Sequence, residues 1–447
     1  MAVIQTKDLR NICFLGHGGS GKTSLAEAML YMNKATDRLG STGAGNTVCD
    51  YDPEEIKRGF TISASCANFN YKNVKINLID TPGFLEFVGE VLTGLRVAGS
   101  AVITVDAKSG IQVGTELAWE NTSAAGSPRA FFVNKCDDPE ANFQKVLSSL
   151  IETFGQSVCP IVVPAATPGA FINLLDLKKY VYDAKGGHTV GEINTDYMPT
   201  VEKYREQLFE AIATTDEALM EKYFEEGELS REEILTGLSL GVKEGVITPV
   251  CCCAAQPNIG IPTLLDNLVN YMPAASEAKA PKAVDAKTGE PVEIKQDGKF
   301  AAQVIKTVVD QFGKYSIIKV YSGTLDAAVT PYNSNSEKSE KPGTIYIMRG
   351  KKTVQVDKLI AGDIGALAKL QFTATGDTLC DASAPVKFDA IEFPKPCISL
   401  AVSAKKQGEE DKVFAGLNKL LEEDPTITLD KNAETGDVLL SGLGEVH

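Results

Sequence analysis

The sequence lacks the features of a membrane-spanning or secreted protein. No apolar run approaches the roughly 18 residues that cross a bilayer, and residues 1–10 contain no apolar core of a signal peptide. The ten cysteines include no C-x-x-C pair. Cys251, Cys252 and Cys253 would alternate between the faces of a strand, so they cannot all ligate one zinc ion. We predict reduced, mostly buried thiols in a cytoplasmic protein without a membrane segment.

Basic residues are also in deficit. The chain has 44 Lys+Arg against 59 Asp+Glu, a formal net charge of −15. This balance disfavours a surface that coats nucleic acid, and we predict no sequence-specific DNA binding. Local basic patches, or docking on a protein-rich part of a ribonucleoprotein, stay open. We expect a monomer.

Length and periodicity predict several domains. At about 100–200 residues per domain, 447 residues make two to four. In residues 1–275, short apolar runs alternate with helical patterns, which predicts an α/β domain built on a doubly wound parallel sheet, with a subdomain inserted at about 165–246. The predicted strands are residues 11–15, 74–79, 100–105, 130–133, 159–163 and 249–255.

The remaining residues have a different pattern. Residues 276–298 are rich in Ala, Lys, Pro and Glu and predict a surface linker. Residues 299–393 show a period of two between turn residues, which predicts an antiparallel β-barrel. Residues 394–447 predict an incomplete βαββ domain of the α+β ferredoxin-like type. Because the chain stops where another helix would begin, we infer that it is a fragment of a longer protein.

A phosphate-binding pattern, G-x-x-x-x-G-K-[ST], follows the first predicted strand and precedes a helix. Backbone N–H groups of such a loop surround phosphates, the lysine adds a point charge, and the Thr23 hydroxyl ligates Mg²⁺. A glycine-rich turn with a chance lysine is the alternative, and this strand–loop–helix context disfavours it. The predicted nucleotide-binding residues are Gly16, His17, Gly18, Gly19, Ser20, Gly21, Lys22 and Thr23.

Two further segments complete a predicted metal and γ-phosphate site. The second strand is followed by Asp80, Thr81, Pro82 and Gly83; the aspartate can hold a Mg²⁺-bound water, and the Gly83 N–H can sense a γ-phosphate. Alone, the D-x-x-G motif is a weak signal, but it becomes a strong one because it follows the phosphate loop at the expected spacing. Thr61 is a candidate second hydroxyl ligand to Mg²⁺, with an ordinary exposed threonine as the alternative.

The base is predicted to be guanine. Asn134, Lys135 and Asp137 form the pattern N-K-x-D after a strand. A carboxylate at Asp137 can accept hydrogen bonds from N1–H and N2–H₂ of guanine, a donor pair that adenine lacks. This disfavours a P-loop ATPase, and we predict GTP and GDP with Mg²⁺ as the ligands.

Together these residues resemble translation elongation factor G, over essentially the whole chain. R-G-x-T-I at residues 58–62 before D-T-P-G, and the long gap after N-K-x-D, are similar to that family. Its second and third domains are similar at V-Y-S-G (320–323), T-G-D-T-L (375–379), E-E-D-P-T (422–426) and S-G-L-G-E-V-H (441–447). The resemblance implies a translational GTPase that docks on the ribosome and acts in translocation or recycling.

The resemblance also assigns residues to catalysis and base binding. Lys22, Thr61 and Gly83 fall on the family's catalytic and switch positions. Ala254 and Ala255 fall where the family has Ser-Ala beside guanine O6, and the second backbone N–H can still serve.

The chain departs from the family at the hydrolytic residues. Phe84 replaces the histidine that positions the attacking water, and phenylalanine has no donor or acceptor. Gly19 replaces an aspartate linked to a monovalent cation, and the apolar pair beside the catalytic residue becomes Gly18 and Phe60. The chain looks more like the divergent elongation factor G-like paralogues. A GTP-dependent ribosome-binding switch with little hydrolysis is therefore the alternative function.

Overall fold

The computed structural model describes residues 4–183, 187–310 and 313–447. It divides into two compact units. The α/β unit contains Arg10–Gly83 and Ala98–Ala278, and the β-rich unit contains Met1–Leu9, Phe84–Val97 and Lys279–His447. Residues 1–3 of the predicted first domain and residues 184–186 of the predicted insertion lie outside the described residues.

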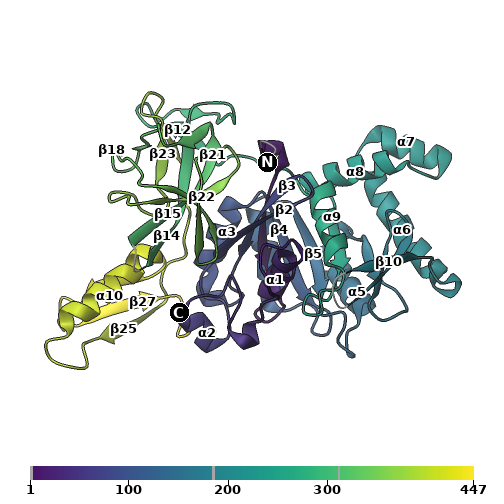
Figure 1. The fold of residues 1–447 in the computed structure, drawn as a ribbon, viewed down its shortest axis with the longest axis horizontal. Helices are drawn as coiled ribbons and strands as arrows, with labels where there is room; N and C mark the ends of the chain where they lie inside the picture. Colours follow the sequence, from purple (N-terminus) through teal and green to yellow (C-terminus); the bar gives the residue numbers. More distant parts are fainter. Residues whose placement is uncertain (1–3, 184–186, 311–312) are drawn as a thin grey trace. The chain divides into compact units, whose positions relative to one another are not determined.

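A seven-stranded sheet forms the core of the α/β unit, in the order β2-β3-β1-β4-β5-β11-β6 (Figure 1). Neighbours from β1 to β6 run parallel, which confirms the doubly wound prediction, whereas the edge strand β2 is antiparallel to β3. Every residue of β4 is buried, as expected for a strand covered on both faces. The strands are β1 (Leu9–Leu15), β2 (Ser65–Tyr71), β3 (Val74–Asp80), β4 (Ser100–Asp106), β5 (Arg129–Asn134), β6 (Val158–Pro160) and β11 (Thr248–Cys252).

Helices of this unit form where apolar residues recur at helical spacing. In α5 the buried residues are Phe143, Val146, Leu147 and Leu150, one stripe along a helix. The Asn142 side chain caps its start by accepting a hydrogen bond from the Lys145 N–H at 3.0 Å. The helices of the main fold are α1 (Lys22–Met32), α2 (Pro53–Arg58), α4 (Val113–Ala124), α5 (Phe143–Phe154) and α9 (Ile261–Tyr271).

The predicted insertion contains a second sheet as well as helices. Its strands are β7 (Val162–Pro164), β8 (Ala170–Asn173), β9 (Lys178–Tyr182) and β10 (His188–Gly191), in the order β10-β9-β8-β7. Its helices α6 (Met198–Ala213), α7 (Glu217–Glu226) and α8 (Arg231–Lys243) lie on the side of α9 away from α1 in Figure 1. The sequence pattern did not predict this sheet: its edge strand β10 is mostly exposed and its neighbour β9 is mostly half-buried.

An antiparallel sheet dominates the β-rich unit, as predicted. Its order is β18-β17-β23-β14-β15-β22-β19-β20. One of its buried clusters is aliphatic apart from Phe300 and includes Val304, Ile318 and Leu367. The strands are β14 (Ala301–Asp310), β15 (Gly313–Ser322), β17 (Tyr332–Asn333), β18 (Lys338–Ser339), β19 (Ile345–Arg349), β20 (Lys352–Gln355), β22 (Ile364–Ala368) and β23 (Thr378–Cys380), with β16 (Thr324–Asp326) pairing with β21 (Lys358–Ile360).

The segment predicted as a linker contains two short strands. β12 (Ala283–Asp285) and β13 (Pro291–Val292) form a small sheet with β24 (Val386–Phe388). Ala283 pairs with Phe388, about a hundred residues away in the chain. Strands of two or three residues are too short to show a period in the sequence, and the strand that pairs with β12 lies too far along the chain to be inferred from local pattern.

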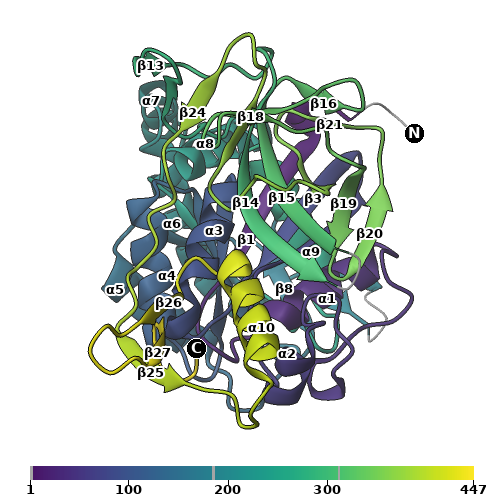
Figure 2. The ribbon, with the colours of Figure 1, turned by 90° about the vertical axis from the view of Figure 1, so that its left-hand side faces the viewer.

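The last residues form the predicted βαββ unit. Strands β25 (Ile398–Val402), β26 (Thr428–Lys431) and β27 (Val438–Gly442) are antiparallel, in the order β25-β27-β26. Helix α10 (Glu410–Glu423) lies between β25 and β26 in the chain and beside β14, as Figure 2 shows. Glu423 accepts a hydrogen bond from the Val309 N–H at 2.6 Å, which joins helix and strand.

Helix α3 (Val88–Val97) belongs to the β-rich unit, although it follows β3 in the chain. Glu90 forms an ion pair with Lys306 at 2.5 Å, and both side chains are largely buried. Arg96 contacts Asp389 and donates to Gln303 Oε1 at 2.8 Å. No helix among the described residues of the chain is long and apolar enough to cross a membrane.

Candidate nucleotide-binding site

The predicted phosphate loop lies between β1 and α1 and requires glycine at two positions. A Cβ on Gly16 would lie 2.4 Å from the Thr104 carbonyl oxygen, and one on Gly21 would lie 2.2 Å from Asn134 Nδ2. Both glycines have left-handed φ angles, 128° and 95°. The Thr104 carbonyl and the Asn134 side chain thus approach the loop closely, and the loop leads into the N-terminus of α1, where backbone N–H groups can bind an anion.

Lys22 and Ser20 are buried polar groups within this loop. The Lys22 ammonium donates to the carbonyl oxygens of Gly16 at 2.9 Å and His17 at 3.0 Å. The Ser20 hydroxyl has no hydrogen-bond partner among the described residues. A buried cation and an unsatisfied hydroxyl fit a phosphate.

The predicted metal-binding side chains meet at the start of α1. Thr23 and Thr61 place their hydroxyl oxygens 3.2 Å apart. Asp80, at the end of β3, is fully buried, and no described residue gives either carboxylate oxygen a hydrogen bond of good geometry, although the nearby Thr23 hydroxyl and the charge of Lys22 both act to lower its pKa. A buried carboxylate without donors is costly unless a cation is near. Hydroxyl and carboxylate oxygens are ligands that suit Mg²⁺.

Asp50 also faces this site and was not predicted as a functional residue. Its side chain is 5% exposed, and Oδ1 accepts a hydrogen bond from the Thr61 hydroxyl at 2.8 Å. Burial raises the pKa of Asp50, whereas Thr61 and the charge of Lys22 lower it. The segment 50–55 holds four acidic residues, so the sequence offered no rule for choosing this one.

The ligand-free protein is expected to lose stability as the pH rises from about 4 to about 8. Burial, and then the charge of Asp50, raise the pKa of Asp80 from its ordinary 3.8 to about 8. The folded state therefore binds more protons than the unfolded chain in this interval, and stability falls with pH. Burial lowers the pKa of Lys22 from 10.5 to about 8, so its contribution acts above this interval and rises with pH.

Asp80→Asn should make the decline between pH 4 and 8 shallower; the buried carboxyl groups of Asp50, Glu27 and Glu55, whose pKa values burial also raises, account for the part that remains. The measurement is the urea midpoint of both proteins from pH 5 to 9, without nucleotide or Mg²⁺. An equally steep decline in the variant would show that Asp80 does not cause it.

The predicted guanine loop follows β5 and joins two other loops. Asn134 donates from Nδ2 to the Ser20 carbonyl at 3.2 Å and accepts from the Ala255 N–H at 3.0 Å. Lys135 has a left-handed φ of 62° and donates to the Gly19 carbonyl at 2.7 Å. Asp137 is exposed, as a base-reading carboxylate must be before ligand arrives.

Ala255 differs from the expectation in one respect. Its N–H, assigned by resemblance to guanine O6, donates to the Asn134 side chain. Guanine O6 would have to share or displace that hydrogen bond. Ala254 and Ala255 are each 1% exposed, so the loop backbone, rather than a side chain, would meet the base.

Asp106 orients Lys135 and was missed by sequence reasoning. It ends β4, and Lys135 Nζ lies 2.7 Å from its Oδ2. The N–H groups of Lys108 and Ser109 donate to its other oxygen. The available signal was its position, because parallel strands bring the residues at their carboxyl ends to one edge of a sheet.

Asp106→Asn is expected to weaken GDP binding up to about fivefold, the range of a partly exposed ion pair. The charge of Asp106 holds Lys135 in place. The affinity of the wild-type protein for GDP should therefore be more sensitive to salt than that of Asp106→Asn. Calorimetric titration at low and high salt checks this. Glu140→Gln, which removes the exposed Lys108–Glu140 pair nearby, is the control. Equal affinities for Asp106→Asn and wild type would contradict the role.

Gly83 packs against the phosphate loop. A Cβ there would lie 2.5 Å from the Gly18 nitrogen and 2.6 Å from Lys22 Nζ. Thr81, by contrast, is fully buried and donates to the Phe14 carbonyl at 2.5 Å, so it anchors the segment to β1. Phe84 begins the other unit and is 37% exposed.

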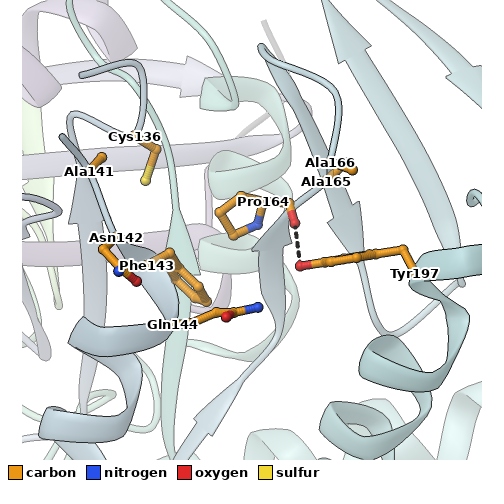
Figure 3. Close-up of a pocket in the computed structure, with 9 residues that line it drawn as sticks. All are labelled: Cys136, Ala141, Asn142, Phe143, Gln144, Pro164, Ala165, Ala166 and Tyr197. Atoms are coloured by element: carbon orange, nitrogen blue, oxygen red, sulfur yellow. Dashed lines mark hydrogen bonds between the residues drawn. The ribbon is translucent and has the colours of Figure 1, made fainter. Parts of the chain in front are cut away.

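A pocket of about 220 Å³ lies beside the guanine loop (Figure 3). Tyr197 and Pro164 face the start of α5 across it, and the Tyr197 hydroxyl donates to the Pro164 carbonyl at 3.1 Å. Cys136 is its one lining residue from the N-K-x-D segment, and none of the predicted nucleotide-binding residues lines it. It is therefore not the nucleotide site.

Comparison with protein families identifies all three parts of the chain. Residues 7–274 match the Elongation factor Tu GTP binding domain, residues 299–382 match Elongation factor G domain 2, and residues 393–447 match Elongation Factor G, domain III. The chain belongs to the elongation factor G family. Its architecture of a translational GTPase domain followed by antiparallel β domains confirms the predicted fold class.

A solved structure is similar to this elongation factor G family chain over nearly its whole length. It is the crystal structure of a protein from Thermus thermophilus, with 30% sequence identity and a TM-score of 0.88. The match covers 98% of this chain and 64% of that one. The chain therefore spans just under two thirds of the length of that protein.

Proposed function

We propose that the protein binds GTP and GDP with Mg²⁺ and hydrolyses GTP to GDP and phosphate, with stimulation by the ribosome in translocation or recycling. The observation that carries this proposal is Asp80, a buried carboxylate without a well-formed protein hydrogen bond beside the Thr23 and Thr61 hydroxyls. The neighbouring Asn134–Lys135–Asp137 loop supports guanine as the base. The family match supports the ribosome as the partner.

The residues present divide the work of binding and charge neutralisation. N–H groups of residues 16–23 and the Lys22 ammonium bind the phosphates. The oxygens of Thr23, Thr61, Asp50 and Asp80 would hold the metal, directly or through water. Bound Mg²⁺ would supply neutralisation of the phosphate charge. Gly83 lies close to Lys22 and to the phosphate loop, so its N–H would be available to the terminal phosphate.

The predicted site residues include no side chain that is suited to orient the attacking water. In-line attack on the γ-phosphate needs a group that accepts a hydrogen bond from the water. Phe84 has no polar side-chain atom, so a backbone carbonyl or a ribosomal group must perform this task. Intrinsic hydrolysis is therefore slow.

A GTP-dependent ribosome-binding switch is the second candidate, and Phe84 is the observation that favours it. Thr61 and Gly83 would report the γ-phosphate, and hydrolysis would be incidental. GTP turnover measured with and without ribosomes separates the two functions. Strong stimulation supports the GTPase, whereas tight GTP-dependent ribosome binding without turnover supports the switch. Failure to bind either guanine nucleotide would overturn both.

A further inference from the structure

A buried glutamate that takes no part in the proposed chemistry contacts the loop before Thr61. Glu27, on α1, is 1% exposed. Its Oε2 accepts a hydrogen bond from the Gly40 N–H at 3.1 Å, and its Oε1 accepts one from the Val48 N–H at 2.6 Å. One side chain thus binds both ends of residues 40–48, which we call the switch loop.

The switch loop is shaped to receive this carboxylate. A Cβ on Gly40 would lie 2.2 Å from Glu27 Oε2, so a larger residue there would force the carboxylate to move. Within the loop, the Asn46 side chain accepts from the Ser41 N–H at 2.8 Å. The loop is therefore a closed turn whose two ends meet at Glu27.

The attachment continues to the proposed metal site. Two residues after the end of the switch loop comes Asp50. Its N–H donates to the Thr47 hydroxyl at 3.2 Å, and its carboxylate accepts a hydrogen bond from the Thr61 hydroxyl. Glu55, also buried, accepts from the N–H groups of Ile62 and Ser63 at 3.0 and 3.1 Å. Buried carboxylates thus hold the backbone just before Asp50, through Glu27, and just after Thr61, through Glu55.

Helix α1 connects this attachment to the phosphate loop. Thr23 and Glu27 are four residues apart, so they lie on the same face of the helix. Thr23 faces Thr61, and Glu27 binds the switch loop that leads to Asp50. A helix that binds phosphate at its first turn also holds the segment that completes the metal site.

We propose that Glu27 is a positioning residue that fastens the switch loop to α1 and so holds Asp50 and Thr61 in place for Mg²⁺ and the γ-phosphate. This inference rests on the proposed binding of GTP and Mg²⁺. A purely structural glutamate would stabilise the fold equally in all ligand states. A positioning residue acts on Mg²⁺-dependent GTP binding and on the order of the switch loop.

Glu27→Gln tests the proposal from the helix side. The amide keeps one acceptor and turns an N–H₂ group toward a backbone N–H, so one of the two attachments is lost. We expect the Mg²⁺ concentration for half-maximal binding of a non-hydrolysable GTP analogue to rise about tenfold, with GDP affinity in EDTA unchanged. Tryptic cleavage after the exposed Arg38 should be about tenfold faster in the Mg²⁺–analogue complex. The control is Glu54→Gln, in the same region, whose exposed side chain pairs with Lys57 and Arg58.

Gly40→Ala tests it from the loop side and does not alter α1. Its new methyl group would displace the Glu27 carboxylate, so it should shift Mg²⁺ dependence and cleavage in the same direction. Gly43→Ala is the matched control, because a Cβ there would meet only Ser41 Oγ, at 3.8 Å.

The two hypotheses fail in different ways. Wild-type protein that binds no guanine nucleotide would overturn the proposed function. Wild-type binding with Glu27→Gln and Gly40→Ala both unchanged would overturn the inference alone. An equal loss of GDP affinity in EDTA and of GTP affinity in Mg²⁺ would overturn it too, because it would show general damage to the fold. If Glu27→Gln does not fold, Gly40→Ala against Gly43→Ala decides.

Discussion

Asp137→Asn is expected to lower GTP affinity about 100-fold or more and to raise affinity for xanthosine triphosphate. The Asp137 carboxylate would accept from both N1–H and N2–H₂ of guanine, and hydrogen bonds to a charged group are the stronger kind. Asparagine turns an amide donor toward the guanine N2–H₂ group. Xanthine has a carbonyl at that position, which accepts from the amide.

Competition titrations against a fluorescent GDP analogue measure this change. Asp138→Asn is the control, because its carboxylate accepts from the Glu140 N–H and not from a base. The Asp138→Asn control should still bind GTP in preference to ATP. A preserved preference for GTP over xanthosine triphosphate in Asp137→Asn would remove Asp137 from base recognition.

Phe84→His is expected to raise ribosome-stimulated GTP hydrolysis about 100-fold, the lower end of what a positioned acid–base group contributes. Imidazole can accept a hydrogen bond from the attacking water, whereas the benzyl group cannot. The gain should appear in kcat with little change in GTP affinity, because a water-positioning group acts on the transition state.

Single-turnover hydrolysis with and without ribosomes provides the measurement, and Phe84→Leu is the apolar control. No acceleration in Phe84→His would show that water is already oriented by another group. Turnover of about 1 s⁻¹ or faster by wild-type protein alone, the low end of ordinary enzymes, would contradict the expected slow intrinsic rate.

Local sequence predicted most of the sheet and both β-containing parts of the chain. Buried parallel strands such as β4 are mainly apolar, and the long antiparallel strand β15 is rich in β-branched and aromatic residues. The strands β8 to β10 and the pair β12 and β13 were not predicted. They are short, and β12 pairs with a strand about a hundred residues away, so their stability comes from partners rather than from their own pattern.

The site residues show the same division. Residues 16–23, 80–83 and 134–137 are contiguous motifs, and the structure brings their loops together. Asp50, Asp106 and Glu27 carry no motif. Each becomes notable only through a contact with a segment at least eleven positions away in the chain, namely Thr61, Lys135 and the switch loop.

The family, the order of domains and the proposed choice of guanine follow from residue types at contiguous spacing, since a loop that surrounds phosphate or reads a base depends on local backbone and side-chain chemistry. The burial of Asp80 without a hydrogen bond of good geometry, the donation of the Ala255 N–H to Asn134 and the attachment of the switch loop to Glu27 could be recognised only after folding. Burial and removal from water are properties of the packed chain, and they determine what an unpartnered carboxylate costs and what a paired one can hold in place.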